Sequence, residues 1–164
     1  MDLEKLKVDV SDWIVRWVSV SNPNLGKIPC PFAKNALLNN KIDWHWVEDA
    51  NHLKLLLRSI MEQGLSNEVL VAGMDPNMIT TSELSEITKQ ANEKWLMPMD
   101  IVALEDHPND LEIIAGTKMN QGTYALVLIQ SKTKLNQASK ILHKQGYYDN
   151  WTQKQIDDVV TWRL

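Results

Sequence analysis

Apolar side chains recur along this chain with a period typical of helices. The first segment, from Leu3 to Val18, has apolar residues three or four positions apart, which predicts an amphipathic helix. It should end near Ser21-Asn22-Pro23, because the residue before a proline disfavours helical backbone angles. Similar patterns predict a short helix over 31–39 and longer helices over 50–63, 80–95, 132–145 and the segment that follows Thr152.

Short apolar or β-branched runs between these helices predict strands. They are IDWHWVE (42–48), EVLVAG (68–73), MDIVALE (99–105) and YALVLIQ (124–130), with a further short candidate in LEIIA (111–115). Strands that alternate with helices predict a single α/β domain over 1–164, with a mixed, mostly parallel sheet of about four strands packed by helices. The strands at 99–105 and 123–130 are the candidates for an antiparallel pair.

Capping signals support the helix boundaries. Gly64 stands where a helix C-cap glycine is expected. Thr80 with Glu83, and Thr152 with Gln155, match the capping box, in which two side chains satisfy the free amide groups at a helix start. The helices over 80–95 and after Thr152 should therefore begin at these residues.

Composition and charge narrow the function classes. The chain has 164 residues, 44% of them hydrophobic and 23% charged, as expected of one folded domain. A net charge of −4 without a Lys/Arg cluster counts against nucleic-acid binding. No apolar run is long enough to span a bilayer, and the first residues do not resemble a signal peptide. One cysteine cannot form an intramolecular disulfide, so a cytoplasmic location is expected, while the oligomeric state stays open.

The single cysteine lies in the stretch KIPCPFAKNALL, residues 27–38. Pro31 suits the first position of a helix, which would make Cys30 the N-cap residue. There a thiol would face free backbone N–H groups and the positive end of the helix dipole, which lowers its pKa. Lys27 and Lys34 would add to this effect. The alternative is that Cys30 is a small, buried apolar residue of the core.

Two resemblances bear on this site. The residues Cys30-Pro31-Phe32-Ala33 resemble the active-site motif of glutaredoxins and omega-class glutathione transferases, in which a thiolate attacks a disulfide or a glutathione adduct. The order of Cys30–Lys34, His107-Pro108 and Ala115-Gly116-Thr117 resembles a little-characterised bacterial family. That resemblance implies a site that combines these segments, and it makes His107 the candidate partner of Cys30.

The first hypothesis is therefore a thiol-dependent enzyme that acts on a small molecule or a thiol. Cys30 would be the nucleophile and His107 its acid or base, with Asp106, Asp110 or Glu112 orienting the imidazole. The other expected binding residues are Phe32, Lys34, Asp106, Gly116 and Thr117. No cofactor is predicted, although glutathione or a metal ion would suit these residues. No phosphate-binding glycine loop and no serine-hydrolase elbow occurs.

Two further hypotheses remain open. In one, the protein is a non-catalytic interaction or accessory protein, with a structural Cys30 and a contact surface rich in Trp and Tyr. The stretches IDWHWVED (42–49) and GYYDNW (146–151) are candidates for that surface, although core packing would also explain their aromatic residues. In the other, Cys30 and His107 are ligands of a metal ion in a metal-dependent enzyme.

Overall fold

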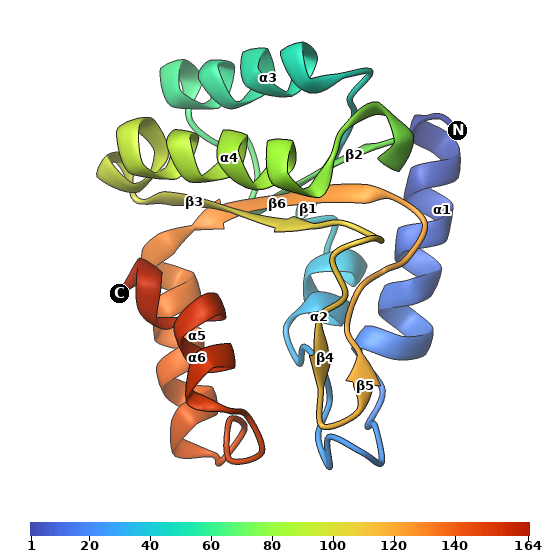
Figure 1. Ribbon diagram of the computed structural model, residues 1–164, viewed down its shortest axis with the longest axis vertical. Helices are drawn as coiled ribbons and strands as arrows, with labels where there is room; N and C mark the ends of the chain where they lie inside the picture. Colours follow the sequence, from blue (N-terminus) through green and yellow to red (C-terminus); the bar gives the residue numbers. More distant parts are fainter.

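The computed structural model describes residues 1–164, and every helix and strand expected from the sequence is present (Figure 1). Two very short strands form a hairpin beside the main sheet. In chain order the elements are α1 (Leu3–Trp13), the π-helix η1 (Ile14–Val18), α2 (Ala33–Leu38), β1 (Ile42–Trp46), α3 (Ala50–Gln63), β2 (Val69–Met74), the 3₁₀ turn η2 (Pro76–Met78), α4 (Thr81–Ala91), the π-helix η3 (Asn92–Leu96), the 3₁₀ turn η4 (Met97–Met99), β3 (Ile101–Asp106), β4 (Ile113–Ile114), β5 (Thr117–Lys118), β6 (Ala125–Ser131), α5 (Lys132–Lys144), α6 (Gln153–Val159) and the 3₁₀ turn η5 (Thr161–Arg163).

The main sheet has four strands in the order β1-β2-β6-β3, which confirms the predicted α/β class. β1 and β2 are parallel, and β6 pairs antiparallel with both β2 and β3. Three strands therefore point the same way, but β6 lies between two of them, so only one neighbouring pair is parallel. The reason is the connection before β6, which contains the β4–β5 hairpin instead of a crossover helix and returns the chain in the opposite direction.

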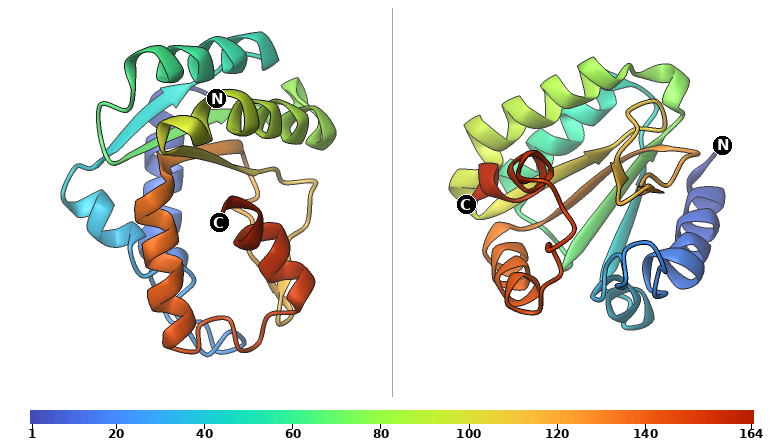
Figure 2. Two further views of the ribbon diagram at one scale, coloured as in Figure 1. Left: turned by 90° about the vertical axis from the view of Figure 1, so that its left-hand side faces the viewer. Right: turned by 60° about the horizontal axis from the view of Figure 1, so that its bottom comes forward.

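Helices cover both faces of the sheet (Figures 1 and 2). On one face, α3 and α4 enclose the larger core, to which Leu53, Leu57 and Leu84 contribute fully buried side chains. On the other face, α1 and η1 pack their apolar stripe against β2 and β6 in a second core. Trp44 and Trp46 pack against this second core, as expected for one face of β1. α5 and α6 lie on the same side of the sheet as α1, at its other end.

The helix boundaries follow the local signals. Thr80 accepts a hydrogen bond from the main-chain N–H of Glu83, and Thr152 with Gln155 forms the complete capping box. Gly64 ends α3 with φ 77°, an angle that glycine adopts without steric cost. None of the helices combines the length and the apolar character that crossing a membrane requires.

The N-terminal helix approaches the sheet closely at one point. Gly73 of β2 faces Leu6, and a Cβ atom at Gly73 would lie 2.4 Å from Leu6 Cδ1. A polar contact accompanies this packing, because the hydroxyl of the buried Tyr124 donates to the Asp9 carboxylate at 2.6 Å. These contacts fix α1 on the face of the sheet that also receives the Cys30 segment.

Candidate functional site

The helix after Cys30 begins later than its sequence predicts, so Cys30 is not its N-cap residue. α2 begins at Ala33, and Phe32 precedes it with φ −94° and ψ −23°. Cys30 and Pro31 therefore lie outside the regular helix. The main-chain N–H groups of Phe32 and Ala33 nevertheless act to lower the pKa of the Cys30 thiol.

The electrostatic consequence differs from the prediction. Cys30 is partly buried and packs against the second core, near α1 and α2. Burial raises the pKa of the Cys30 thiol, and the two N–H groups, which act in the opposite direction, do not compensate for it. Cys30 therefore favours its neutral thiol form and not the expected thiolate, because burial changes its pKa more than the two N–H groups do.

The residues expected to surround the thiol point elsewhere. The Lys27 ammonium group donates to the main-chain carbonyl of Gln145 at 2.9 Å. Phe32 and Lys34 are exposed to solvent, and Lys34 forms no ion pair. None of these side chains forms a hydrogen bond to Cys30.

His107 is a buried structural residue, with 3% of its surface exposed. Its Nε2 lies 3.1 Å from the carbonyl oxygen of Ile79 and 3.3 Å from that of Pro76, while Nδ1 accepts the N–H of Asn109 at 3.1 Å. This pattern requires the neutral tautomer with its proton on Nε2. Because main-chain groups occupy both ring nitrogens, the structure gives His107 no hydrogen bond to Cys30.

Asp106 does not orient His107. One oxygen of its carboxylate accepts from the Asn120 amide at 2.7 Å, and the other accepts the N–H of Gln121 at 2.9 Å. Burial raises the pKa of Asp106 despite these hydrogen bonds. The carboxylate therefore fixes the loop that leads from the β4–β5 hairpin to β6.

Gly116 and Thr117 belong to the β4–β5 hairpin. Ala115 and Gly116 form its two-residue turn with φ values of 49° and 76°, the positive angles that a type I′ turn needs. The Thr117 hydroxyl is buried and lies 3.4 Å from the side-chain oxygen of Asn22. The Ala-Gly-Thr motif thus serves a tight turn that contacts the N-terminal loop.

The residue that meets the Cys30 segment is Tyr147, in the connection between α5 and α6. Its hydroxyl donates a hydrogen bond to the main-chain carbonyl of Pro29. Burial is the main cause that raises the pKa of Tyr147, and the nearby Cys30 contributes to the same direction. With the contact between Lys27 and Gln145, this joins two segments that lie 118 residues apart.

Tyr147 belongs to an aromatic cluster that we define as Tyr147, Tyr148 and Trp151. The ring centroids lie 5.0 Å apart for Tyr147 and Tyr148, and 5.1 Å apart for Tyr148 and Trp151, with nearly perpendicular planes in both pairs. Such edge-to-face contacts are favourable for aromatic rings. Tyr148 is buried, with 8% of its surface exposed, so the cluster is a packed unit and not a loose surface patch.

Tyr148 also forms one wall of a pocket between α5 and α6. The pocket has a volume of about 360 Å³, which lies within the usual range for small-ligand sites. Its walls are mainly apolar, and three basic side chains of α5 contribute to them. The nine lining residues are Ser139, Lys140, His143, Lys144, Tyr148, Ile156, Val160, Thr161 and Leu164.

Arg163 contacts Ser139, one of the lining residues, and has 2% of its surface exposed. Its guanidinium group donates to the Val159 carbonyl at 3.1 Å, to the Ser139 hydroxyl at 2.9 Å and to the side-chain oxygen of Asn136. Burial lowers the pKa of Arg163. All three acceptors are neutral, and Arg163 takes part in none of the ion pairs of the structure.

The sequence did not indicate this pocket. Lys140, His143 and Lys144 share one face of the predicted helix at spacings of three and four residues, which was the available signal. The approach of α6 and Arg163 to that face depends on tertiary contacts. For the proposed metal site, no group of three or more His, Cys, Asp or Glu side chains is arranged to hold an ion.

Comparisons with protein-family models, with curated proteins and with solved structures found no match for this chain. The resemblances of the Cys30 and His107 segments to known families therefore stay predictions from their motif residues.

Proposed function

We propose that this protein acts by non-covalent binding, as an accessory or interaction protein, and that its binding site is the pocket between α5 and α6. The observation that carries the proposal is the pocket itself, with its apolar walls, its three basic residues and a volume suited to a small ligand or to one inserted side chain of a partner. The aromatic cluster supports one wall of it.

Cys30 has a structural part in this proposal. The segment before Cys30 contacts the aromatic cluster, because the main-chain carbonyl of Pro29 accepts a hydrogen bond from Tyr147. A buried thiol with a raised pKa suits such packing better than nucleophilic chemistry. His107 also has a structural part, because its Nε2 joins the end of β3 to the main-chain carbonyls of Pro76 and Ile79 at η2.

Thiol chemistry is a second candidate, and one observation favours it. The main-chain N–H groups of Phe32 and Ala33 act to lower the pKa of Cys30 and would stabilise a thiolate. A reaction there would require the loop at Pro29 to separate from Tyr147, so that the sulfur gains access to solvent and to a thiol or disulfide substrate. The reactivity of Cys30 toward iodoacetamide distinguishes the two candidates.

The binding proposal is tested with N-phenyl-1-naphthylamine, a neutral apolar dye whose fluorescence rises in apolar sites. The folded protein is expected to bind it saturably. Ile156→Trp, which fills the pocket with a larger side chain, should weaken binding at least about tenfold, a change that corresponds to 1.4 kcal/mol. Leu55→Trp is the matched control, because Leu55 is exposed on α3, away from the pocket.

Cys30→Ala should leave the dye affinity within about twofold of the native value, provided that the variant keeps its circular dichroism spectrum. Absence of saturable binding to the native protein would overturn the proposal, as would equal affinities of the native protein and the Ile156 variant.

A further inference from the structure

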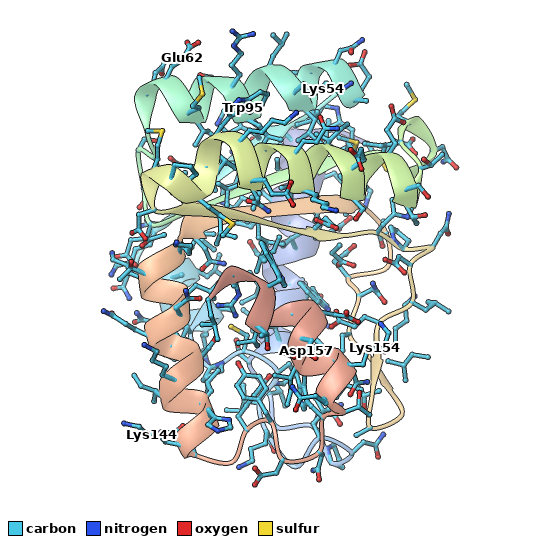
Figure 3. The ribbon with its side chains drawn as sticks, turned by 60° about the vertical axis from the view of Figure 1, so that its left-hand side comes forward. Lys54, Glu62, Trp95, Lys144, Lys154 and Asp157 are labelled. Carbon is cyan, nitrogen blue, oxygen red and sulfur yellow. The ribbon has the colours of Figure 1, made fainter.

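Basic side chains of α5 line the α5–α6 pocket of a chain that is acidic as a whole. The net charge is −4, yet Lys140, His143 and Lys144 line the pocket and no Asp or Glu side chain does. In Figure 3, Lys144 lies at the end of α5, on the opposite side of the molecule from Lys54 on α3. His143 and Lys144 also lie in the last turn of α5, where basic residues suit the helix dipole. This does not explain why Arg163 is buried without an opposite charge.

Arg163 is a buried cation without an anion. Charged side chains are rarely buried unless an opposite charge accompanies them, because removal from water costs more than hydrogen bonds to neutral groups return. Here the three acceptors of the guanidinium group are two neutral side chains and one main-chain carbonyl. An anion in the neighbouring pocket would supply the missing opposite charge.

Ser139 connects Arg163 with the pocket. Its side chain lines the pocket while only 5% of the residue is exposed. The Ser139 hydroxyl accepts from Arg163 Nη2 at 2.9 Å, and its own hydrogen forms no hydrogen bond with another group of the protein. A hydroxyl polarised by a guanidinium group is a strong donor toward an anionic oxygen. The buried end of the pocket therefore carries a free donor, whereas Tyr148, Ile156 and Val160 offer apolar surface.

We propose that this pocket binds a small amphipathic anion, which has an apolar body and a single acidic group. The acidic group accepts a hydrogen bond from Ser139 and lies in the positive field of Lys140, Lys144 and Arg163. The apolar body packs against Tyr148, Ile156 and Val160. This inference rests on the proposed function, because it assigns a ligand class to the same pocket.

The test compares two dyes that share one ring system. 8-Anilino-1-naphthalenesulfonate carries an acidic group, and N-phenyl-1-naphthylamine lacks it. Each is titrated into the native protein at low and at physiological ionic strength, with fluorescence as the readout. We expect the anionic dye to bind at least about tenfold more tightly, as a hydrogen bond to a charged group would give. The difference should shrink as salt increases.

Two pocket variants test which residues cause the preference for the anionic dye. Ser139→Ala and the double variant Lys140→Gln/Lys144→Gln should each reduce the ratio of the two affinities at least about fivefold, while the neutral dye binds as before. Lys54→Gln, on α3, is the matched control and should leave the ratio unchanged. The double variant leaves all three hydrogen bonds of Arg163 in place, whereas Ser139→Ala removes one of them, so the circular dichroism spectrum of Ser139→Ala is compared with that of the native protein.

The outcomes separate the two proposals. Equal binding of both dyes to the native protein would overturn the anion preference and leave the pocket as a binding site. An affinity ratio that is the same in the native protein and in both pocket variants would also overturn it. If neither dye binds, the proposed function fails, and the ligand assignment fails with it.

Discussion

The side-chain amide of Asn92 pairs with both main-chain polar groups of Ala103. Its nitrogen donates to the Ala103 carbonyl and its oxygen accepts the Ala103 N–H, each at 2.8 Å. β3 is an edge strand, so these groups have no partner strand on that side. Asn92 lies in η3 with 3% of its surface exposed. Its side chain makes the two hydrogen bonds that a neighbouring strand would otherwise make with Ala103.

Asn92→Leu should lower the free energy of unfolding by about 2–4 kcal/mol, because it leaves one buried donor and one buried acceptor without partners. Urea denaturation measures this loss. Asn24→Ala, in an exposed loop, should change stability by less than about 0.5 kcal/mol. The amide hydrogen of Ala103 should also exchange faster in Asn92→Leu, and unchanged exchange there would contradict the assigned pairing.

The sequence predicts those parts of the fold that depend on neighbouring residues. Gly64 and the Thr152–Gln155 capping box mark helix ends because their effect is local. The position of β6 between β2 and β3 depends on which strands meet in space, and residue spacing does not encode that. Cys30 combines both cases, since its N–H contacts are local whereas its burial comes from α1 and from Tyr147, far away in the chain.

Cys30 should react slowly with iodoacetamide. Burial raises its pKa, so the thiolate population at neutral pH is smaller than that of a free cysteine, whose pKa is about 8.5. The rate of alkylation should increase with pH along a curve whose midpoint lies above that value. The protein unfolded in urea is the control and should react like glutathione. A midpoint below about 8.5 in the folded protein would instead support the thiol-enzyme candidate.

Tyr147→Phe should increase the alkylation rate of Cys30. The substitution removes the hydroxyl that donates to the Pro29 carbonyl but keeps the ring in the aromatic cluster. The loop that carries Cys30 then opens more often, so the measured rate should rise several-fold with little change in the midpoint pH. Tyr124→Phe is the matched control for a general loss of packing. It removes a hydroxyl that donates to Asp9 of α1 and not to the Cys30 segment. Equal alkylation rates in both variants would show that the hydrogen bond of Tyr147 does not limit access to Cys30.

Glu112→Gln should stabilise the protein at neutral pH. Desolvation raises the pKa of Glu112, and the charges of Asp106, Asp110 and Asp158 add to this. The folded state thus favours protonated Glu112, and its contribution to stability is complete below the unfolded pKa of about 4.3 and is lost as pH rises through the folded pKa. The gain at pH 7 should stay below about 1 kcal/mol because water screens the group, and it should vanish near pH 4.

Urea denaturation of both proteins at pH 7 and pH 4 measures this difference. Glu93→Gln is the control, since Glu93 is exposed on η3 and forms no ion pair. A larger gain at pH 4 than at pH 7 would show that the sign of the Glu112 effect is reversed.

Gly73 and Leu6 should show strong energetic coupling. Gly73→Ala places a Cβ atom 2.4 Å from Leu6 Cδ1 and 2.7 Å from Leu6 Cδ2, and Leu6 is fully buried, so the side chain has no free space to enter. The substitution should cost about 1–3 kcal/mol as overpacking. Leu6→Ala alone should cost about 2–5 kcal/mol because it leaves a cavity. In the double variant the new methyl group occupies part of that cavity, so the total loss should be at least about 1 kcal/mol smaller than the sum of the two single losses.

The control is Gly73→Ala combined with Leu84→Ala, in the core on the other face of the sheet. The effects of these two substitutions should be additive within about 0.5 kcal/mol. Urea denaturation of the single and double variants tests both statements, and additivity of the Gly73 and Leu6 effects would mean that α1 shifts away from β2 when the methyl group is added.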